Sequence, residues 1–551
     1  MDRGLLVLAL VALAALLATL PAVDGSFVYD DAVYLVDNPA VAGEASPWST
    51  SLGDPRQALW RPLTVLSWQL QWDGPHRAAP LLWGNVLLHV LVSVLVVLLG
   101  RRLGAGAAGA AVAGLLFAVH PVHAEAVGWV TGRAELLAAA LVLGAWLAYL
   151  REGAGAVALS CVALAMAGLS KENALAAPAL FAVADLWRGR RPLPWGRLAL
   201  LGVTAVGVFA LRTTVLPEAL PQDGPFLDTP LAGRAVVALN VLGYALRLLV
   251  WPEPLRIEYQ RDEFTTLRPE AALAGLLLAV VVWRARDRRL PALGLALTAV
   301  ALAPVSHLLP IGEPFAERFL YLPSVGFCLA AGAALEALGR REKAAGSGLG
   351  LSAAVVLVAA TLGLLGSRAA VAVLRDDLSL WRHAARVAPR LALTHYNLGS
   401  HLHQSGHHVT LDRDEPGCTD ALRTSLELEP RHLFAPFAHQ VLGVHALEGA
   451  PHAPSDPWTA ADHFREALDQ MPVLVEPRLN LAAIAASSPD IVPRHEATAL
   501  LRPVLESPNV SLEQRAAAEE LLLQVSSSGA AGVSPSGGAT EATGTSSPEG
   551  S

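Results

Sequence analysis

Long apolar stretches, repeated along the first two thirds of the chain, constrain its fold more than any other feature. They lie near residues 4–23, 81–99, 104–120, 134–150, 155–169, 173–187, 196–216, 232–251, 270–283, 291–311, 318–338 and 348–370. A helix needs about 20 apolar residues to cross a bilayer, and roughly 17 is the lower limit. We therefore expect an all-α membrane bundle of about 11–12 spans, in which two or three short stretches are tilted, re-entrant or interfacial.

The composition agrees with a polytopic membrane protein. Of 551 residues, 53% are hydrophobic and only 16% are charged, against roughly 25% charged in soluble domains. The net charge of −8 suggests no nucleic-acid partner. Three cysteines are too few for a disulfide framework, and Cys418 stands alone in the downstream part. The scarcity of lysine beside many arginines, alanines and glycines indicates a bacterial protein from a GC-rich genome.

Arginine-rich short loops predict the orientation, because such loops collect on the cytoplasmic side. The clusters are Arg101-Arg102, Arg188–Arg191, Arg284–Arg289 and Arg340–Lys343. The first long loop, 24–80, is then external, together with the loops near 120–133 and 310–318 and everything after residue 370.

The same rule leaves one conflict in the middle of the chain. Residues 217–231 and 252–269 both come out external, although the apolar stretch 232–251 separates them. Either that stretch is re-entrant or interfacial, or a neighbouring span is drawn wrongly.

After residue 370 the chain becomes polar and shows internal similarity. THYNLGSHLHQSG is followed by ALRTSLELEP, AHQVLGVHALEG by AADHFREALDQMP, and EPRLNLAAIAAS by ATALLRPVLESP. Each unit pairs a helix carrying Leu-Gly or Leu-Ala with a second helix ending in proline, which is the tetratricopeptide scheme. Trp381–Pro389 resembles the second helix of a further, degenerate unit. A generic helical domain is the alternative.

These patterns divide the chain into three parts. We expect a multi-span membrane domain over 1–370, a tetratricopeptide-like domain over 371–525 and a tail over 526–551. The tail is rich in Gly, Ser, Thr and Pro and should be disordered. Helical repeat arrays present extended concave binding surfaces, so a protein or peptide is the expected partner of the second domain.

Charged residues inside or beside membrane spans are costly and mark function by default. Five clusters stand out: Asp30-Asp31; Arg61 in WRPLTVLSW; His120, His123, Glu125, Arg133 and Glu135; Lys171-Glu172 in LSKEN; and Glu313, Glu317, Arg318 and Tyr321. Four of them fall on the predicted external side. Cations gathered there can hold an anionic leaving group such as a lipid-linked phosphate, and a carboxylate can accept a proton from an attacking hydroxyl.

Plainer interpretations exist for each cluster. Asp30 and Asp31 can be ordinary charges of a solvated loop, and the cations can be interface anchors that snorkel from helix ends. His120, His123 and Glu125 straddle a loop and offer no helical ligand face for a metal. We predict a hydrogen-bond network there and no metal site.

Taken together, the motifs resemble one family. They are DD after the first span, WRPL, HPVHAEAVGWVTGRAELL, SKEN, AERFLYLPSVGF and the C-terminal repeats, over roughly residues 25–510. The family is that of the transmembrane and tetratricopeptide-repeat-containing protein O-mannosyltransferases and their bacterial relatives. The resemblance implies a C-type membrane glycosyltransferase fold and an inverting transfer of a sugar, mannose or another, from a polyprenyl-phosphate donor to a hydroxyl of an acceptor protein.

The resemblance also implies roles for individual residues. The first external loop of the family supplies an acidic catalytic residue, which is Asp30 or Asp31 here. We favour Asp30 as the base and Asp31 as the residue that orients the acceptor, although the sequence does not separate them. Charge and predicted side add donor-phosphate candidates (Arg133, Lys171 and Arg318) and substrate-orienting candidates (Arg61, His123, Glu125 and Glu317). The donor is the lipid-linked sugar phosphate, and no further cofactor and no metal are expected.

We expect an integral protein of the bacterial inner membrane with its repeats on the periplasmic side. A scaffold and a transporter are the two alternative functional classes. A non-catalytic scaffold that recruits partners through its repeats would tolerate Asn at Asp30 and Asp31. A transporter is disfavoured, because the charges gather at one face and no inverted repeat is visible.

Overall fold

The computed structural model describes residues 3–48, 59–216, 224–284, 290–309, 311–346, 350–405, 417–449 and 455–530. Every secondary-structure element in these ranges is helical. The chain divides into two compact units, Met1–Ala388 and Pro389–Ser551. The boundary falls after the predicted residue 370, because helix α16 (Asp377–Val387) belongs to the first unit.

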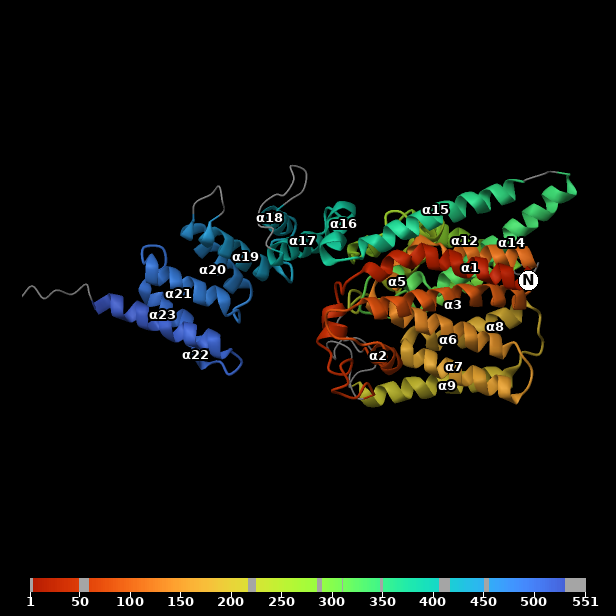
Figure 1. Cartoon of the computed structure of the whole chain (residues 1–551), viewed down its shortest axis with the longest axis horizontal. Helices are drawn as coiled ribbons and strands as arrows, with labels where there is room; N and C mark the ends of the chain where they lie inside the picture. The colour runs from red at the N-terminus through yellow and green to blue at the C-terminus, as the bar shows by residue number, and fades with distance from the viewer. Residues whose placement is uncertain are drawn as a thin grey trace, which may run out of the picture. The chain divides into compact units, whose positions relative to one another are not determined.

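The first unit is a bundle of apolar helices (Figure 1). Its longer helices are α1 (Arg3–Thr19), α3 (Ala79–Leu103), α4 (Ala107–Ala118), α6 (Arg133–Tyr149), α7 (Ala154–Ser170), α8 (Ala177–Trp187), α9 (Trp195–Val215), α10 (Leu231–Val250), α12 (Glu270–Arg284), α13 (Leu290–Leu302), α14 (Pro323–Ala344) and α15 (Leu351–Val373). Short helices are α2 (Pro62–Gln69), α5 (Ala124–Gly128) and α11 (Asp262–Thr265). Helices α1, α3, α6, α7 and α9 pack in that order, each against the next.

Six helices in the described ranges are long and apolar enough to cross a membrane. They are Arg3–Asp24, Ala79–Leu103, Val130–Tyr149, Trp195–Val215, Leu231–Val250 and Leu351–Val373. A seventh is added if Ala107–Ala118 and Pro121–Gly128, which meet at a bend of 51°, form one broken span. The predicted membrane bundle is confirmed. The number of full-length spans is below the predicted 11–12, because several apolar stretches form helices shorter than a bilayer requires.

Small residues let some of these helices approach closely. A Cβ atom on Gly294 of α13 would lie 2.5 Å from the backbone oxygen of Gly326 in α14, and the reverse distance is the same. Without a strong hydrophobic force between helices in lipid, such close backbone packing is a main source of association.

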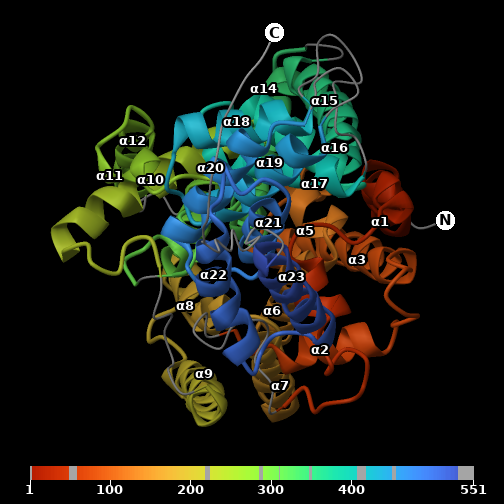
Figure 2. The same cartoon turned by 90° about the vertical axis from the view of Figure 1, so that its left-hand side faces the viewer.

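The polar segment that follows helix α10, near residues 252–269, packs along this helix. Asp228, just before α10, pairs with Arg261 at 3.0 Å, and Asn240, midway along the helix, donates to the carbonyls of Phe264 and Thr266 at 2.8 and 2.7 Å. Figure 2 shows α10, α11 and α12 side by side. The polar segment thus follows the helix instead of meeting only its ends. This packing favours the interfacial alternative for residues 232–251, although α10 has the length of a span.

The second unit consists of helix pairs. These are α17 (Ala392–Gln404) with α18 (Cys418–Leu428), α19 (Ala435–Glu448) with α20 (Pro457–Gln470), and α21 (Glu476–Ser487) with α22 (Arg494–Glu506), followed by α23 (Leu512–Ala530). A Cβ atom on Gly443 would lie 2.6 Å from the Phe464 ring, so the first helix is small where the second packs against it. The predicted pairing of helices is confirmed, and helix α16, which contains Trp381, lies outside it because α16 belongs to the first unit.

The predicted tail begins later than residue 526. Helix α23 continues to Ala530, and residues 531–551 lie outside the described part. The arginines at 285–289 and the inserts at 406–416 and 450–454 lie outside it as well.

Candidate functional site

Asp31 is a buried anchor of the first long loop. Its Oδ1 accepts hydrogen bonds from the Thr131 backbone N–H at 3.0 Å and from the Thr131 hydroxyl at 2.6 Å. Its Oδ2 accepts one from the Val28 N–H at 3.1 Å. Burial raises the pKa of Asp31 to about 7, against the hydrogen bonds from Thr131 and Val28, which favour the charged form. The carboxylate therefore ties the loop to the turn η5 (Val130–Gly132) and has little capacity left for a substrate.

Asp30, its neighbour, has a different environment. It is half-buried, and its carboxylate accepts no hydrogen bond from any residue that the structure describes. Burial raises the pKa of Asp30 to about 6; the Arg318 charge opposes this rise, whereas the Glu313 and Glu125 charges add to it. Asp30 is thus a carboxylate with free acceptor oxygens near a cation, which is what a general base requires.

Arg318 is held by Glu125. The Arg318 backbone N–H donates to Glu125 Oε2 at 2.7 Å, and its guanidinium donates through Nη1 to the other carboxylate oxygen. The guanidinium carbon lies 5.0 Å from the centre of the Trp129 ring, a cation–π arrangement. Within the described ranges, Nε and Nη2 of Arg318 have no hydrogen-bond acceptor. These two nitrogens keep the planar pair of donors that suits a phosphate or carboxylate.

The WRPL and SKEN motifs meet beside this pair. Arg61 donates two hydrogen bonds to Glu172, from Nε at 3.1 Å and from Nη2 at 2.8 Å. Arg212 approaches the same carboxylate at 3.5 Å, and Thr64 Oγ1 donates to the Ser170 carbonyl at 2.9 Å. The LSKEN cluster, whose side depended on the span count, therefore lies with the first long loop, which carries Arg61 and Thr64.

Lys171 is a buried cation of the same group. Its ammonium donates to Glu135, and its Nζ lies 5.4 Å from the centre of the Phe319 ring. Burial lowers the pKa of Lys171, Glu135 opposes that effect, and the positive charges of Arg61 and Arg318 lower it further. Three predicted cations, Arg61, Lys171 and Arg318, are thus close enough to influence one another.

Arg133 lies apart from these cations, in the core. Its Nε donates to Asn85 Oδ1 at 2.9 Å, and its two other nitrogens donate to the carbonyls of Ser67 and Leu81. The side chain is only 1% exposed. Backbone carbonyls therefore occupy the donors that the sequence analysis assigned to a phosphate.

His123 is buried among aromatic rings. Its Nε2 lies 2.9 Å from Ser324 Oγ, and its ring centre lies 4.3 Å from that of Phe117 and 4.8 Å from that of Tyr321. His120 instead contacts the Leu249 carbonyl through Nε2 at 2.9 Å. The two histidines thus have separate partners and do not face Asp30.

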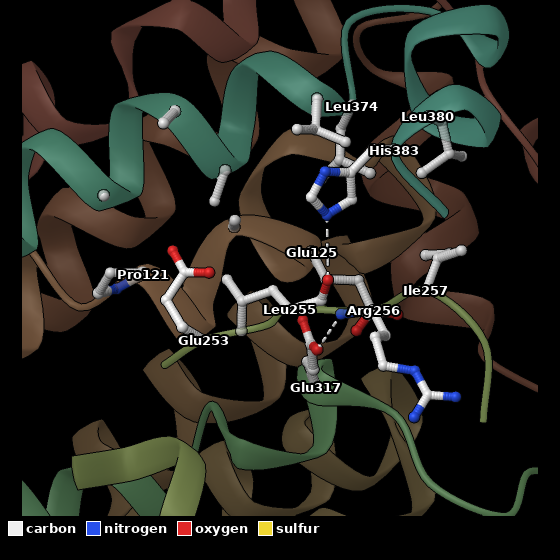
Figure 3. A pocket seen from close by; sticks show the side chains of 15 residues that line it. Pro121, Glu125, Glu253, Leu255, Arg256, Ile257, Glu317, Leu374, Leu380 and His383 are labelled. Carbon is white, nitrogen blue, oxygen red and sulfur yellow. Dashed lines mark hydrogen bonds between the residues drawn. The ribbon is translucent and has the colours of Figure 1, made fainter. Parts of the chain in front are cut away.

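Glu317 borders a cavity of about 220 Å³ (Figure 3). Its carboxylate accepts from the Tyr259 hydroxyl at 2.6 Å and from the Arg256 backbone N–H. Burial raises the pKa of Glu317 to about 8, and the Glu125 charge raises it further. The cavity's polar lining includes Glu125, Glu253, Arg256, Glu317 and His383, and its apolar wall comes from Gly366 and Ala370 of α15 and from Leu374 and Leu380. Glu125 thus borders both the cavity and Arg318.

Three residues of this region were missing from the sequence predictions. Tyr29, beside Asp30, donates its hydroxyl to Glu258 and its backbone N–H to Asp377 Oδ1 at 2.8 Å. Its ring centre lies 5.4 Å from that of Trp129 and 5.5 Å from that of Trp381. Glu258 lies in a charged segment between two apolar stretches. Because charges beside membrane spans are energetically costly, this position is a sequence signal by which Glu258 could have been identified. No sequence signal marks Asp377.

Comparisons with known proteins identify relatives, although no protein-family model matches the chain. Protein O-mannosyl-transferase TMTC4 of Homo sapiens is 29% identical over 470 residues, covering 71% of this chain and 63% of the relative. Protein O-mannosyl-transferase Tmtc2 of Drosophila melanogaster is 34% identical over 275 residues, 43% of this chain and 28% of the relative. Protein O-mannosyl-transferase TMTC3 of Homo sapiens is 27% identical over 364 residues, which cover 55% of this chain and 39% of the relative. The chain therefore spans less than two thirds of the length of these relatives.

Proposed function

Because the chain belongs to the TMTC family of protein O-mannosyl-transferases, we propose that it is a membrane glycosyltransferase. In this proposal it moves a sugar, such as mannose, from a polyprenyl-phosphate donor to a hydroxyl of a protein or another exported acceptor. The site faces the outside of a bacterial inner membrane, and the helix pairs of the second unit bind the acceptor protein or peptide. No cofactor beyond the lipid-linked sugar phosphate takes part.

The observation that carries the proposal is the contrast between Asp30 and Asp31. The Asp31 carboxylate accepts hydrogen bonds from Thr131 and Val28, and these bonds fix the loop. No described residue donates a hydrogen bond to the Asp30 carboxylate, and its pKa of about 6 leaves it ionised at neutral pH. A base whose pKa lies near the working pH combines the correct protonation state with useful proton affinity.

The reaction is a single displacement at the anomeric carbon. Asp30 accepts the proton of the acceptor hydroxyl, whose oxygen forms a bond to the anomeric carbon from the face opposite the phosphate. The bond between that carbon and the phosphate oxygen breaks, and its electron pair stays on the phosphate. Attack from the opposite face inverts the configuration. Arg318 stabilises the charge that develops on the leaving phosphate through Nε and Nη2.

The other charged residues support these two. Glu125 orients Arg318 through two hydrogen bonds. Arg61 and Lys171 add positive potential near the phosphate, and Glu317 positions the segment that carries Arg256 and Tyr259. They are positioning residues in this proposal, which assigns no substrate contact to Arg133 or His123.

The cavity beside Glu125 supports a lipid-linked donor. Its apolar wall belongs to α15, a helix long and apolar enough to span a membrane. A chain of isoprene units entering from the bilayer could rest on this wall while its phosphate reaches Arg318.

Sugar transfer in membranes tests the proposal. Labelled polyprenyl-phosphate sugars, with mannose first, are incubated with wild type and Asp30→Asn, and glycosylated protein is counted. We expect the variant to lose about 10²- to 10⁴-fold in rate, the range for a general base. Equal transfer by both proteins would refute the role of Asp30. A non-catalytic scaffold, which the repeat unit would also suit, predicts no transfer from any donor and unchanged partner capture by both proteins.

A further inference from the structure

Three potential metal ligands converge in the second unit, away from the site described above. His403 lies in the last turn of α17, Cys418 is the first residue of α18, and His445 lies near the end of α19. One ligand atom from each residue lies within 4.8 Å of the other two. In the sequence Cys418 stands alone, because the three residues are spread over three helices.

The contacts among these side chains are short. His403 Nδ1 lies 2.9 Å from His445 Nε2, and Cys418 Sγ lies 3.9 Å from His445 Nδ1. Cys418 is fully buried, whereas both histidines are half-buried. The thiol is thus the most deeply buried of the three side chains.

We propose that His403, Cys418 and His445 form a binding site for a late first-row transition metal ion, Zn²⁺ in particular. Thiolate and imidazole are the ligands that Zn²⁺ takes most often, and the alkaline-earth ions, which need oxygen ligands, are excluded. The described residues supply three of the four ligands that a tetrahedral Zn²⁺ site takes.

The distance between the imidazoles suits an ion bound by His403 Nδ1 and His445 Nε2 with little rearrangement of these two ligands. The Cys418 thiol, which contacts the other ring nitrogen of His445 at 3.9 Å, has to turn toward the ion. Two nitrogen ligands bound at about 2.1 Å in a tetrahedron lie roughly 3.4 Å apart, so the imidazoles need to separate only slightly from their present 2.9 Å. Without an ion, one imidazole donates its N–H to the other. On binding, the metal replaces the thiol proton, which is released to solvent, and the donor imidazole carries its N–H on its other ring nitrogen instead, so one proton is released per ion.

Such an ion would join two consecutive repeats. His403 and Cys418 belong to the pair α17 and α18, and His445 belongs to the next pair. In a repeat array each unit contacts mainly its neighbours, so stability depends on the interfaces between them. An ion that binds only the folded array stabilises that interface by mass action.

The unit offers a matched control. His439 and His463 also place two imidazoles in contact, with 3.0 Å between their Nδ1 atoms, on α19 and α20. Among the described residues, no cysteine or third ligand joins this pair in a metal-binding cluster. Changing His439 therefore disturbs a similar imidazole contact without removing a ligand of the proposed site.

Metal binding by the full-length protein in detergent tests the proposal, with Zn²⁺ for affinity and Co²⁺ as a spectroscopic probe. We expect one ion per chain, a thiolate-to-Co²⁺ absorption band and a higher unfolding temperature with Zn²⁺. Cys418→Ser should abolish the band, and both Cys418→Ser and His445→Gln should weaken Zn²⁺ binding by at least about tenfold. His439→Gln should bind as wild type does, and circular dichroism confirms that each variant is folded.

Two results would overturn the proposal. One is the absence of stoichiometric binding by the folded wild type. The other is equal binding by wild type and folded His445→Gln, which would mean that the ion is held elsewhere. If Cys418→Ser fails to fold, the His403→Gln and His445→Gln variants still decide between these outcomes.

Discussion

The backbone N–H of Tyr29 donates a hydrogen bond of 2.8 Å to the carboxylate of Asp377, which lies 348 residues later in the chain. A second bond, from the Ser26 N–H to the Arg375 carbonyl at 2.8 Å, lies beside it. Tyr29 has a φ of +55°, a left-handed conformation that is unfavourable for a bulky residue. The segment around helix α16 therefore helps to hold the backbone next to Asp30 in an unfavourable conformation.

Removing this hydrogen bond should reduce transfer without removing any reacting group. We expect Asp377→Ala to lower the rate by about tenfold or more, because small misplacements of a catalytic group are costly. Asp376→Ala serves as the comparison, since Asp376 caps α16 through the Ser379 N–H at 2.8 Å and leaves the Tyr29 bond intact. Equal losses in the two variants would show that helix stability matters and that the Tyr29 contact does not.

The rate of transfer should depend on pH through Asp30. The base works only when deprotonated, and burial raises its pKa to about 6. Transfer should therefore rise as the pH increases from 5 and level off above about 7. A pH profile of the initial rate in membranes checks this, with Asp30→Glu as a variant that should keep part of the activity. A flat profile between pH 5 and 8 would contradict the assignment.

Asp31 should affect stability more than chemistry. Its folded-state pKa is raised to about 7 from about 3.9 in an unfolded chain. The folded state therefore binds the proton more tightly, and the contribution of this group to stability falls as the pH rises from about 4 to about 7. Asp31→Asn should show a weaker pH dependence over that window. It should also lose about 1–3 kcal/mol at low pH, because its amide meets the Val28 N–H.

Thermal unfolding of purified protein at pH 5 and pH 7.5 measures this difference. Glu258 and Glu317, whose pKa values are also raised, are unchanged in the variant and cancel in the comparison. A variant whose pH dependence matches that of the wild type would show that Asp31 does not titrate as its burial requires.

Arg318 and Arg133 should respond differently to the same substitution. Lysine keeps the charge but loses the planar donors, so Arg318→Lys should lower kcat/KM for the lipid-linked donor by about 10- to 100-fold, the worth of one or two charge-assisted hydrogen bonds. Arg133→Lys should lower the unfolding temperature instead, because Asn85 and two backbone carbonyls lose their donors. Donor titrations and thermal scans on both variants separate the two roles. A large donor effect in folded Arg133→Lys would reverse the assignment.

Much of the architecture follows from the sequence alone. Apolar stretches predict the membrane bundle because the free energy of transfer into a bilayer depends on composition over a short window. The Leu-Gly pattern predicts the helix pairs, since a first helix must be small where its partner approaches, as at Gly443 and Phe464. The cost of charge near a membrane likewise marks the loops that hold Asp30, Lys171 and Arg318.

The surroundings of individual residues depend on the tertiary structure. Asp30 and Asp31 are adjacent and chemically identical, yet Thr131, 100 residues away from Asp31, donates hydrogen bonds to Asp31 only, and no described residue donates one to the Asp30 carboxylate. Arg133 and Arg318 likewise carry the same charge on the same predicted side, yet one is buried among carbonyls. Periodicity and hydropathy are local properties of a sequence. Hydrogen-bond partners and burial depend instead on which distant segments pack together, and the sequence pattern does not encode that choice locally.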